Sequence, residues 1–154
     1  MYLSIDFQEE YKRLDHLCKD CLRSGEGVSE YIRQMEATAY SGRRFVRTWE
    51  DDYQQLKHVR WVRNQLAHEV GTLESDICTE EDLAWVESFY ERIINGTDPF
   101  TLLRKAKEEE ARRAAQRARA EKQEIKSLPQ QQTPPVESRS IWDKLVSRIK
   151  RFFS

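Results

Sequence analysis

Three polar residues form the string Arg63-Asn64-x-x-x-His68 near the middle of the chain. A histidine titrates near neutral pH, so it can take up or release a proton during a reaction. An arginine supplies a permanent cation whose fork of N–H groups fits a phosphate. An asparagine can orient either the imidazole or the phosphate. Together, these residue types favour chemistry at a phosphate group.

The string lies late in residues 49–70, a segment with the apolar periodicity of a helix. At about 100° per residue, Arg63 and His68 are about 140° apart around one helix, whereas Asn64 and His68 share a face. Arg63 falls on the apolar stripe of this helix and is expected to be buried. An arginine in that position requires an anionic partner, a ligand or a second subunit.

The string Arg63-Asn64-x-x-x-His68, late on a long helix of a small all-α bundle, resembles the signature of the HEPN superfamily. That superfamily includes many ribonuclease toxins and the nuclease domains of some CRISPR effectors. The resemblance covers residues 1–103, and residues 31–103 also resemble an uncharacterised family of small bacterial proteins. The resemblance to the HEPN superfamily implies a homodimer in a toxin or phage-defence setting, with the two motifs in one cleft.

The resemblance also implies a reaction, namely metal-independent cleavage of RNA by attack of the ribose 2′-hydroxyl. His68 would be the acid and base, Arg63 would stabilise the phosphate, and Asn64 would position the reacting groups. RNA is then the expected substrate, and an inhibitor or partner protein is a further expected ligand.

Two alternatives remain beside the nuclease. In a non-catalytic, dimeric HEPN-like adaptor, Arg63 pairs with a core carboxylate such as Glu36, and His68 interacts with the carboxyl end of its helix. The third interpretation is a helical bundle unrelated to the superfamily. An Arg63 that faces an open groove favours the enzyme, and an Arg63 that is buried against a carboxylate favours the adaptor.

Further basic residues near the string predict an RNA-binding surface. They are Arg43, Arg44, Arg47, Lys57 and Arg60. This local charge contrasts with the rest of the region, since residues 1–100 carry 12 basic and 20 acidic side chains, a net charge of −8. Residues 101–154 carry 14 basic and 7 acidic side chains, a net charge of +7.

The cysteines and the other histidines are not expected to do chemistry. Cys18 and Cys21 lie three residues apart, so on a helix they share a face and pack as small apolar groups. The alternative is a zinc site completed by Cys78 and His16, but zinc ribbons usually place such pairs in tight turns. His16 and His58 are expected to be ordinary surface histidines. We expect no metal and no cofactor, and the absence of Gly-rich phosphate loops and nucleophile elbows excludes NTPases and α/β-hydrolases.

The apolar spacing predicts an all-α fold with a projecting charged helix and a C-terminal amphipathic helix, and the resemblance implies that its bundle is an HEPN-like antiparallel one. The bundle helices are expected at residues 4–22, 28–39, 49–70, 79–95 and from 99 onward, with a loop at 41–44. Thr48 is a good N-cap, Thr79 with Asp82 resembles a capping box, and Gly71 is a plausible C-cap. The expected domains are a bundle at 1–103, a charged solvent-exposed helix at 104–126, a Pro/Gln-rich linker at 127–138 and a basic amphipathic helix at 139–154.

Length and composition indicate one ordinary domain with appendages. The chain has 154 residues, of which 34% are charged and 38% hydrophobic. No apolar run is long enough to cross a bilayer, and the start MYLSIDFQEE lacks the basic and apolar regions of a signal peptide. Three cysteines are an odd number, which argues against a full disulfide framework. The expected location is the cytoplasm, with a peripheral position at the inner membrane surface if the tail binds there.

Residues 139–154 have the pattern of an amphipathic helix. Their apolar side chains are Trp142, Leu145, Val146, Ile149, Phe152 and Phe153. Lys144, Arg148 and Arg151 lie opposite. The apolar face could fold back onto the bundle, dock in a groove of a partner protein or lie on an anionic membrane surface. The charged segment and the Pro-rich linker before it favour one of the two external targets.

Overall fold

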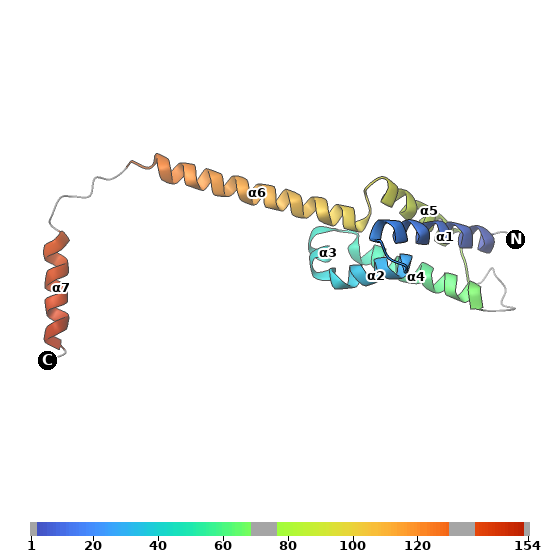
Figure 1. Cartoon of the computed structure of the whole chain (residues 1–154), viewed down its shortest axis with the longest axis horizontal. Helices are drawn as coiled ribbons and strands as arrows, with labels where there is room; N and C mark the ends of the chain where they lie inside the picture. Colours follow the sequence, from blue (N-terminus) through green and yellow to red (C-terminus); the bar gives the residue numbers. More distant parts are fainter. Residues whose placement is uncertain (1–2, 69–76, 130–137, 153–154) are drawn as a thin grey trace. The chain divides into compact units, whose positions relative to one another are not determined.

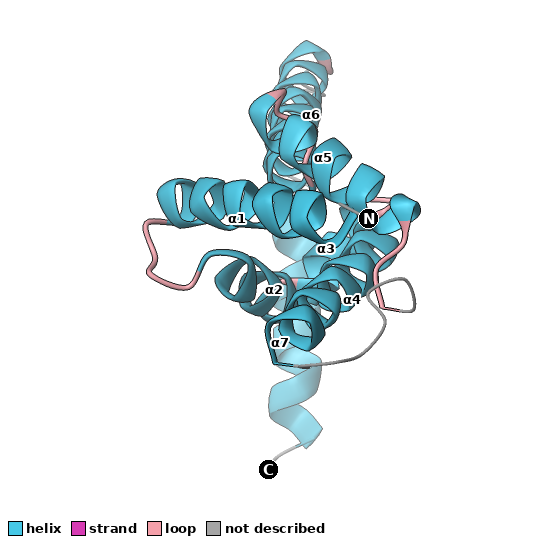
Figure 2. Cartoon of the chain, turned by 90° about the vertical axis from the view of Figure 1, so that its right-hand side faces the viewer, coloured by secondary structure: helices cyan, strands magenta, loops and turns pink. Residues whose placement is uncertain are grey.

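The computed structural model describes residues 3–68, 77–129 and 138–152, and within these ranges it contains seven helices and no strand (Figure 1). The helices are α1 (Leu3–Leu22), α2 (Gly27–Ala37), α3 (Ala39–Phe45), α4 (Trp49–His68), α5 (Glu80–Ile94), α6 (Pro99–Ser127) and α7 (Ser138–Phe152). Figure 2 shows the same helices with the connecting loops in pink. The predicted all-α fold is therefore confirmed.

The chain divides into two compact units, Met1–Arg113 and Ala114–Ser154. The first unit contains α1 to α5 and the beginning of α6, and it holds the hydrophobic core. The second unit contains the rest of α6 and the separate helix α7. Of the predicted linker, residues 130–137 lie outside the described part of the chain.

The core is built where α1, α2, α4 and α5 pack together. Each helix contributes the apolar stripe that its spacing predicts, and the largest fully buried side chains include Phe7, Leu14, Leu56, Val59, Val86 and Phe89. Phe100 at the start of α6 lies against this core, with its ring centroid 4.5 Å from that of Tyr31. Helix α6 thus begins within the bundle, whereas every residue from 107 to 127 is exposed.

The expected loop at 41–44 is wrong, because these residues belong to the short helix α3. Ser41-Gly42 looked like a helix break, but the glycine has a packing role. A Cβ atom on Gly42 would lie 2.1 Å from Cε2 of Trp49, a fully buried side chain at the start of α4. A side chain at this position would therefore force the Trp49 ring or the backbone to shift. The preceding helix ends at Ala37 instead of Ala39.

Side-chain hydrogen bonds lie at two helix starts, and at one of them, α5, they are those of the predicted cap. At α5 a complete capping box is present, since Thr79 Oγ1 accepts from the Asp82 N–H and the Asp82 carboxylate accepts from the Thr79 N–H. Thr48 precedes α4, where its hydroxyl donates to the Asp52 carboxylate over 3.0 Å. The other expected end of that helix, at Val70 and Gly71, lies outside the described residues.

Buried polar pairs join helices that are distant in sequence. The carboxylate of Asp52 on α4 accepts two hydrogen bonds of 2.7 Å from the guanidinium of Arg92 on α5. The Tyr31 hydroxyl of α2 donates over 2.6 Å to Asp98, the residue before α6. Because both carboxylates are buried, each needs this partner, and the pairs fix how the helices meet.

Candidate functional site

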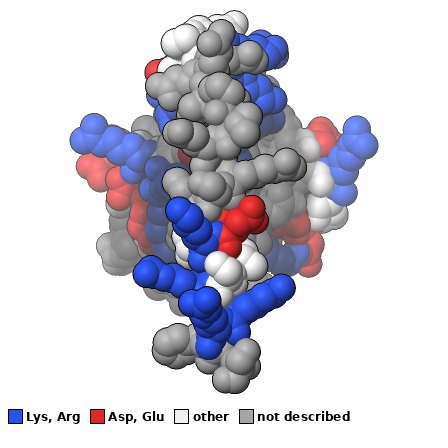
Figure 3. Space-filling view, turned by 90° about the vertical axis from the view of Figure 1, so that its left-hand side faces the viewer, with Lys and Arg blue, Asp and Glu red and all other residues white. Residues whose placement is uncertain are grey.

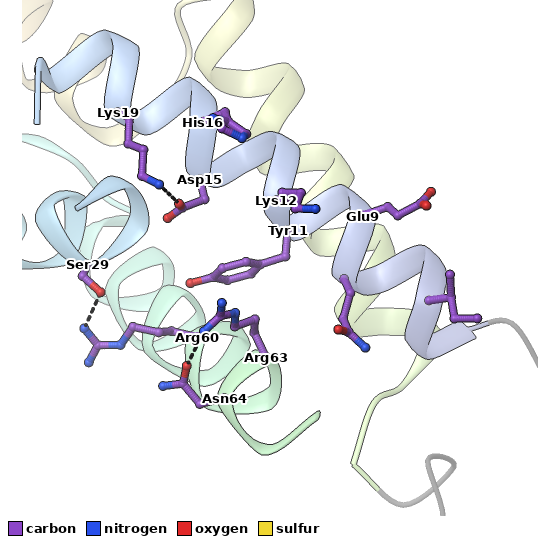
Figure 4. A pocket seen from close by; sticks show the side chains of 12 residues that line it. Glu9, Tyr11, Lys12, Asp15, His16, Lys19, Ser29, Arg60, Arg63 and Asn64 are labelled. Carbon is purple, nitrogen blue, oxygen red and sulfur yellow. Dashed lines mark hydrogen bonds and ion pairs between the residues drawn. The ribbon is translucent and has the colours of Figure 1, made fainter. Parts of the chain in front are cut away.

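A solvent-accessible groove of about 570 Å³ lies between α1 and α4, beside the start of α2 (Figure 4). Arg60, Arg63 and Asn64 line it from α4, and Ser29 lines it from α2. The α1 side is longer and consists of Ile5, Gln8, Glu9, Tyr11, Lys12, Asp15, His16 and Lys19. The groove therefore contains two of the three residues of the predicted motif.

The α4 wall carries two guanidinium groups and an amide. Arg63 Nη1 donates to Asn64 Oδ1 over 3.2 Å, and Arg60 Nη1 donates to Ser29 Oγ over 3.5 Å. Neither arginine forms an ion pair with a carboxylate of the described part of the chain. Both cations are thus available to an anion that enters the groove.

The expectation that Arg63 is buried is wrong, since its side chain is exposed. Its helical position does coincide with the stripe that contains the fully buried Val59 and Val62. The groove, however, leaves this part of the stripe uncovered by α1, as Figure 4 shows. Glu36, the carboxylate expected to pair with Arg63, instead accepts a 2.6 Å hydrogen bond from Tyr53.

The α1 wall is polar and partly tied to the bundle. Asp15 Oδ1 accepts a 2.9 Å hydrogen bond from the N–H of Val28, and Asp15 Oδ2 forms a 2.9 Å ion pair with Lys19. Lys12 and His16 are exposed on the same face. One carboxylate of the groove is therefore already used, and Glu9 is the other acidic side chain of this wall.

Tyr11 links the groove to the core. Its side chain is 6% exposed, and Figure 4 shows its hydroxyl directed from α1 toward Arg60 and Arg63. Burial raises the pKa of the Tyr11 phenol well above its usual value, while the positive charges of Arg63 and Arg60 oppose that rise. The phenol thus remains protonated near neutral pH and can donate a hydrogen bond at the floor of the groove.

The charges of the groove favour an anionic ligand. Lys12, Lys19, Arg60 and Arg63 stand against Glu9 and Asp15, an excess of two positive charges. The surrounding residues 1–100 carry a net charge of −8, so this basic groove is an exception on an acidic unit. Forked guanidinium groups beside a phenol and an amide match the oxygens of a phosphate group.

His68, the third residue of the motif, is not among the residues that line the groove. It is the last residue of α4 and is exposed, about 6 Å along the helix axis beyond Asn64 at a rise of 1.5 Å per residue. The structure therefore brings Arg63 and Asn64 together in the groove and places His68 beyond its end.

Of the five basic residues expected to bind RNA, only Arg60 lines this groove. Arg43 forms an ion pair of 2.9 Å with Glu50, and Arg44 one of 3.3 Å with Glu110. The Lys57 ammonium lies 5.0 Å from the centroid of the Tyr53 ring. Arg47 is exposed in the segment between α3 and α4. Four of the five therefore lie outside the groove that Arg63 lines, and their role in RNA binding stays a prediction.

The cysteines separate into buried and exposed groups. Cys18 and Cys78 are buried in the core, as expected for structural cysteines, but Cys21 is exposed and does not share that environment. In the described ranges, no group of three or more histidine, cysteine or acidic side chains is arranged to hold a metal ion. His16 lines the groove, and His58 lies 2.9 Å from an oxygen of Asp82.

The C-terminal helix α7 begins and ends close to the expected residues. Leu145, Val146 and Ile149 are each at least 50% exposed. The side chains of Trp142, Phe152 and Phe153, expected on the same face, lie outside the described part of the structure. Among the described helices, none is both long enough and apolar enough to cross a membrane.

Sequence reasoning missed the α1 wall of the groove, although a signal was present. Lys12, Asp15, His16 and Lys19 recur at steps of three, one and three residues, which places them on one polar face of a helix. A polar face is usually turned to solvent, so this spacing alone does not show that a second helix lies opposite it. The groove becomes visible only once α1 and α4 are packed.

Comparison with known proteins gives one match. No curated protein and no solved structure is similar to this chain. A family model described as "Family of unknown function (DUF6548)" matches residues 5–153, which is nearly the whole sequence. The chain therefore belongs to this family of unknown function, DUF6548.

Proposed function

We propose that the protein is a metal-independent HEPN-type endoribonuclease that acts as a homodimer in a toxin or phage-defence setting. The proposal rests on the Arg63-Asn64-x-x-x-His68 string together with the place of Arg63 in the fold. The groove between α1 and α4 is the proposed binding site for an RNA phosphate, and the cytoplasm is the proposed location.

The observation that carries the proposal is the uncovered stretch of α4. Arg63 continues a stripe whose earlier members, Val59 and Val62, are fully buried, yet its side chain faces an open groove. Leu66, three residues further along the same stripe, packs against the core again, so the opening is local to Arg63. A local opening in a helix face that is otherwise core favours a further occupant there. A phosphate or a second subunit satisfies the guanidinium, and the dimeric nuclease provides both.

In the proposed reaction, the 2′-oxygen of a ribose attacks the adjacent phosphorus and the bond from phosphorus to the 5′-oxygen breaks. The products are a 2′,3′-cyclic phosphate and a 5′-hydroxyl. Arg63 stabilises the charge that gathers on the phosphate oxygens, because its fork holds two of them at once. His68 takes the 2′-proton or supplies the proton to the leaving oxygen, and Asn64 orients the reacting groups.

The test incubates mixed cellular RNA with purified wild-type protein in EDTA and identifies the product ends. We expect cleavage with 2′,3′-cyclic phosphate ends, and a loss of at least 100-fold in rate for Arg63→Ala and for His68→Ala, as typical for a phosphate-stabilising or acid–base group. Light scattering on the same preparations should give the mass of a dimer. Circular dichroism shows whether each variant keeps its helices.

Arg33→Ala is the matched control, since Arg33 is an exposed arginine of α2 that pairs with Glu26 and Glu30 outside the groove. It should cleave like the wild type. The variant His16→Ala tests whether the imidazole that acts in cleavage is that of His16 and not that of His68, because His16 lines the groove and His68 does not. Full activity of both Arg63→Ala and His68→Ala, or no cleavage by a dimeric wild-type preparation, would refute the nuclease.

The second candidate is a non-catalytic dimeric adaptor that recruits a partner through its C-terminal helix. The position of His68 beyond the groove favours it, because an adaptor needs no imidazole beside Arg63. A dimer that binds RNA or a partner protein without cleaving RNA would support this candidate.

A further inference from the structure

Helix α7 exposes a continuous apolar face. Leu145, Val146 and Ile149 are 50%, 50% and 55% exposed, and all described side chains of this helix, residues 143–151, are exposed. At about 100° per residue these three side chains fall within about 100° of the helix circumference. Exposed apolar faces of this kind mark an interaction site in soluble proteins.

Basic residues lie on both sides of that apolar face. Measured from the line between Leu145 and Ile149, Arg148 lies about 80° to one side and Lys150 about 120° to the other. Lys144 and Arg151 continue the basic surface, and Asp143 is the one acidic residue among residues 143–151. Figure 3 shows the blue basic side chains extending in several directions around this helix, with one red acidic group among them.

We propose that α7 lies flat on an anionic phospholipid surface. The apolar face enters the boundary between headgroups and acyl chains, and the long basic side chains extend sideways to the lipid phosphates. Ser147 lies about 180° from the apolar face and remains in water. A bilayer presents negative charge on both sides of an embedded helix, which matches the two basic edges.

The same charges argue against the other occupants. A protein groove would need acidic residues along the flank of the helix that carries Lys144, Arg148 and Arg151. An RNA surface would satisfy the cations but leave Leu145, Val146 and Ile149 exposed. The lipid surface is the partner that satisfies both halves of the helix at once.

The rest of the chain gives this helix a specific role. Residues 1–100 carry a net charge of −8 and are repelled by an anionic surface, so attachment depends on the basic C-terminal region. The helix has 15 residues, a length of about 22 Å, and an isolated helix of that length is marginal in water. Binding to lipid should therefore raise the helix content of α7 and also hold the protein at the membrane surface.

The experiment is co-sedimentation of the full-length chain with vesicles of phosphatidylcholine and phosphatidylglycerol at three to one, and with vesicles of phosphatidylcholine alone. We expect binding to the anionic vesicles that weakens as salt is raised. The double variant Lys144→Gln/Arg148→Gln should bind about thirty-fold more weakly, from about a fivefold loss for each basic residue removed. Leu145→Gln/Ile149→Gln should lose at least as much, because the inserted face is gone.

The matched control is Arg117→Gln/Arg119→Gln, which removes the same charge from exposed positions of α6 and should bind nearly as the wild type does. Unchanged binding of the Leu145→Gln/Ile149→Gln variant would show attachment by charge alone, as to RNA, and would overturn insertion. A wild-type chain that stays in the supernatant with anionic vesicles would overturn the lipid surface and leave a protein groove as the occupant.

Discussion

The three thiols of the molecule differ in their access to solvent. The pKa of the Cys18 thiol is raised to about 12 and that of the Cys78 thiol to about 11, and burial is the largest cause of both shifts. Cys21, one turn after Cys18 on α1, is exposed. Partial burial and the charges of Asp98 and Asp20 also raise the pKa of Cys21, so it is access to solvent that favours reaction at this thiol.

We therefore expect one thiol of the native protein to react with a disulfide reagent at pH 8, and the other two to react only when the chain unfolds. Cys21→Ser should abolish the fast phase, while Cys78→Ser should leave it intact. The absorbance of the released thiolate gives both the rate and the number of thiols. Three thiols reacting at one rate in native protein would contradict the assignment.

Gly42 is the second residue whose environment makes a sharp prediction. A Cβ atom there would overlap the buried Trp49 ring, at 2.1 Å from Cε2. Gly42→Ala should lower the free energy of unfolding by about 1–3 kcal/mol, because overpacking outweighs the gain of about 1 kcal/mol in helix propensity. Urea unfolding measures the change.

Gly25→Ala is the control, since no atom lies within 4 Å of a Cβ at that position. It should be neutral or stabilise by up to about 1 kcal/mol, through the entropy of the unfolded chain. Equal effects of the two substitutions would show that the contact with Trp49 is not what requires a glycine at position 42.

At the residue scale, sequence reasoning identified the groove only in part. The Arg63-Asn64 pair was found because its types and spacing are unusual, and the structure does place both in one groove. The exposure of Arg63 was not predictable, because helical periodicity gives the direction of a side chain but not whether a neighbouring helix covers it. The place of Tyr11 beside Arg60 and Arg63 depends on the packing of α1 against α4, which helical periodicity does not give.

At the scale of elements, prediction succeeded where the signal was local. The apolar stripes of α1, α4 and α5 and the capping box at Thr79 each depend on residues within a few positions of one another. Helix α3 was missed because its glycine is required by Trp49, which lies in the next helix. The buried Asp52 on α4 was also missed, since its partner Arg92 is 40 residues away.

The capping box at the start of α5 should contribute measurably to stability. Thr79→Ala removes the oxygen that accepts the Asp82 N–H and should lower the free energy of unfolding by about 1 kcal/mol. Thr79→Ser keeps a hydroxyl in the same place and should lose much less. Chemical unfolding of the two variants makes the comparison, and equal losses would show that the methyl group, not the hydroxyl, is what matters.

At the scale of the whole molecule, the division of charge accompanies a division of structure. Residues 1–100 are acidic, residues 101–154 are basic, and the compact units meet between Arg113 and Ala114. Composition reveals such a division because alanine and charged residues cannot form a core. It does not reveal the groove, which depends on how helices of the first unit pack.

The exposure of every residue of α6 from 107 to 127 has a calorimetric consequence. The heat capacity of unfolding comes from apolar surface that becomes hydrated, and this stretch is already hydrated in the native protein. We expect scanning calorimetry to give about 1.8 kcal/mol/K, as for about 130 residues, instead of the roughly 2.1 kcal/mol/K usual for a folded chain of full length. A value of about 2.1 kcal/mol/K would mean that the exposed stretch of α6 is covered in solution. In its thermal response, the chain should therefore behave as a smaller protein than its length indicates.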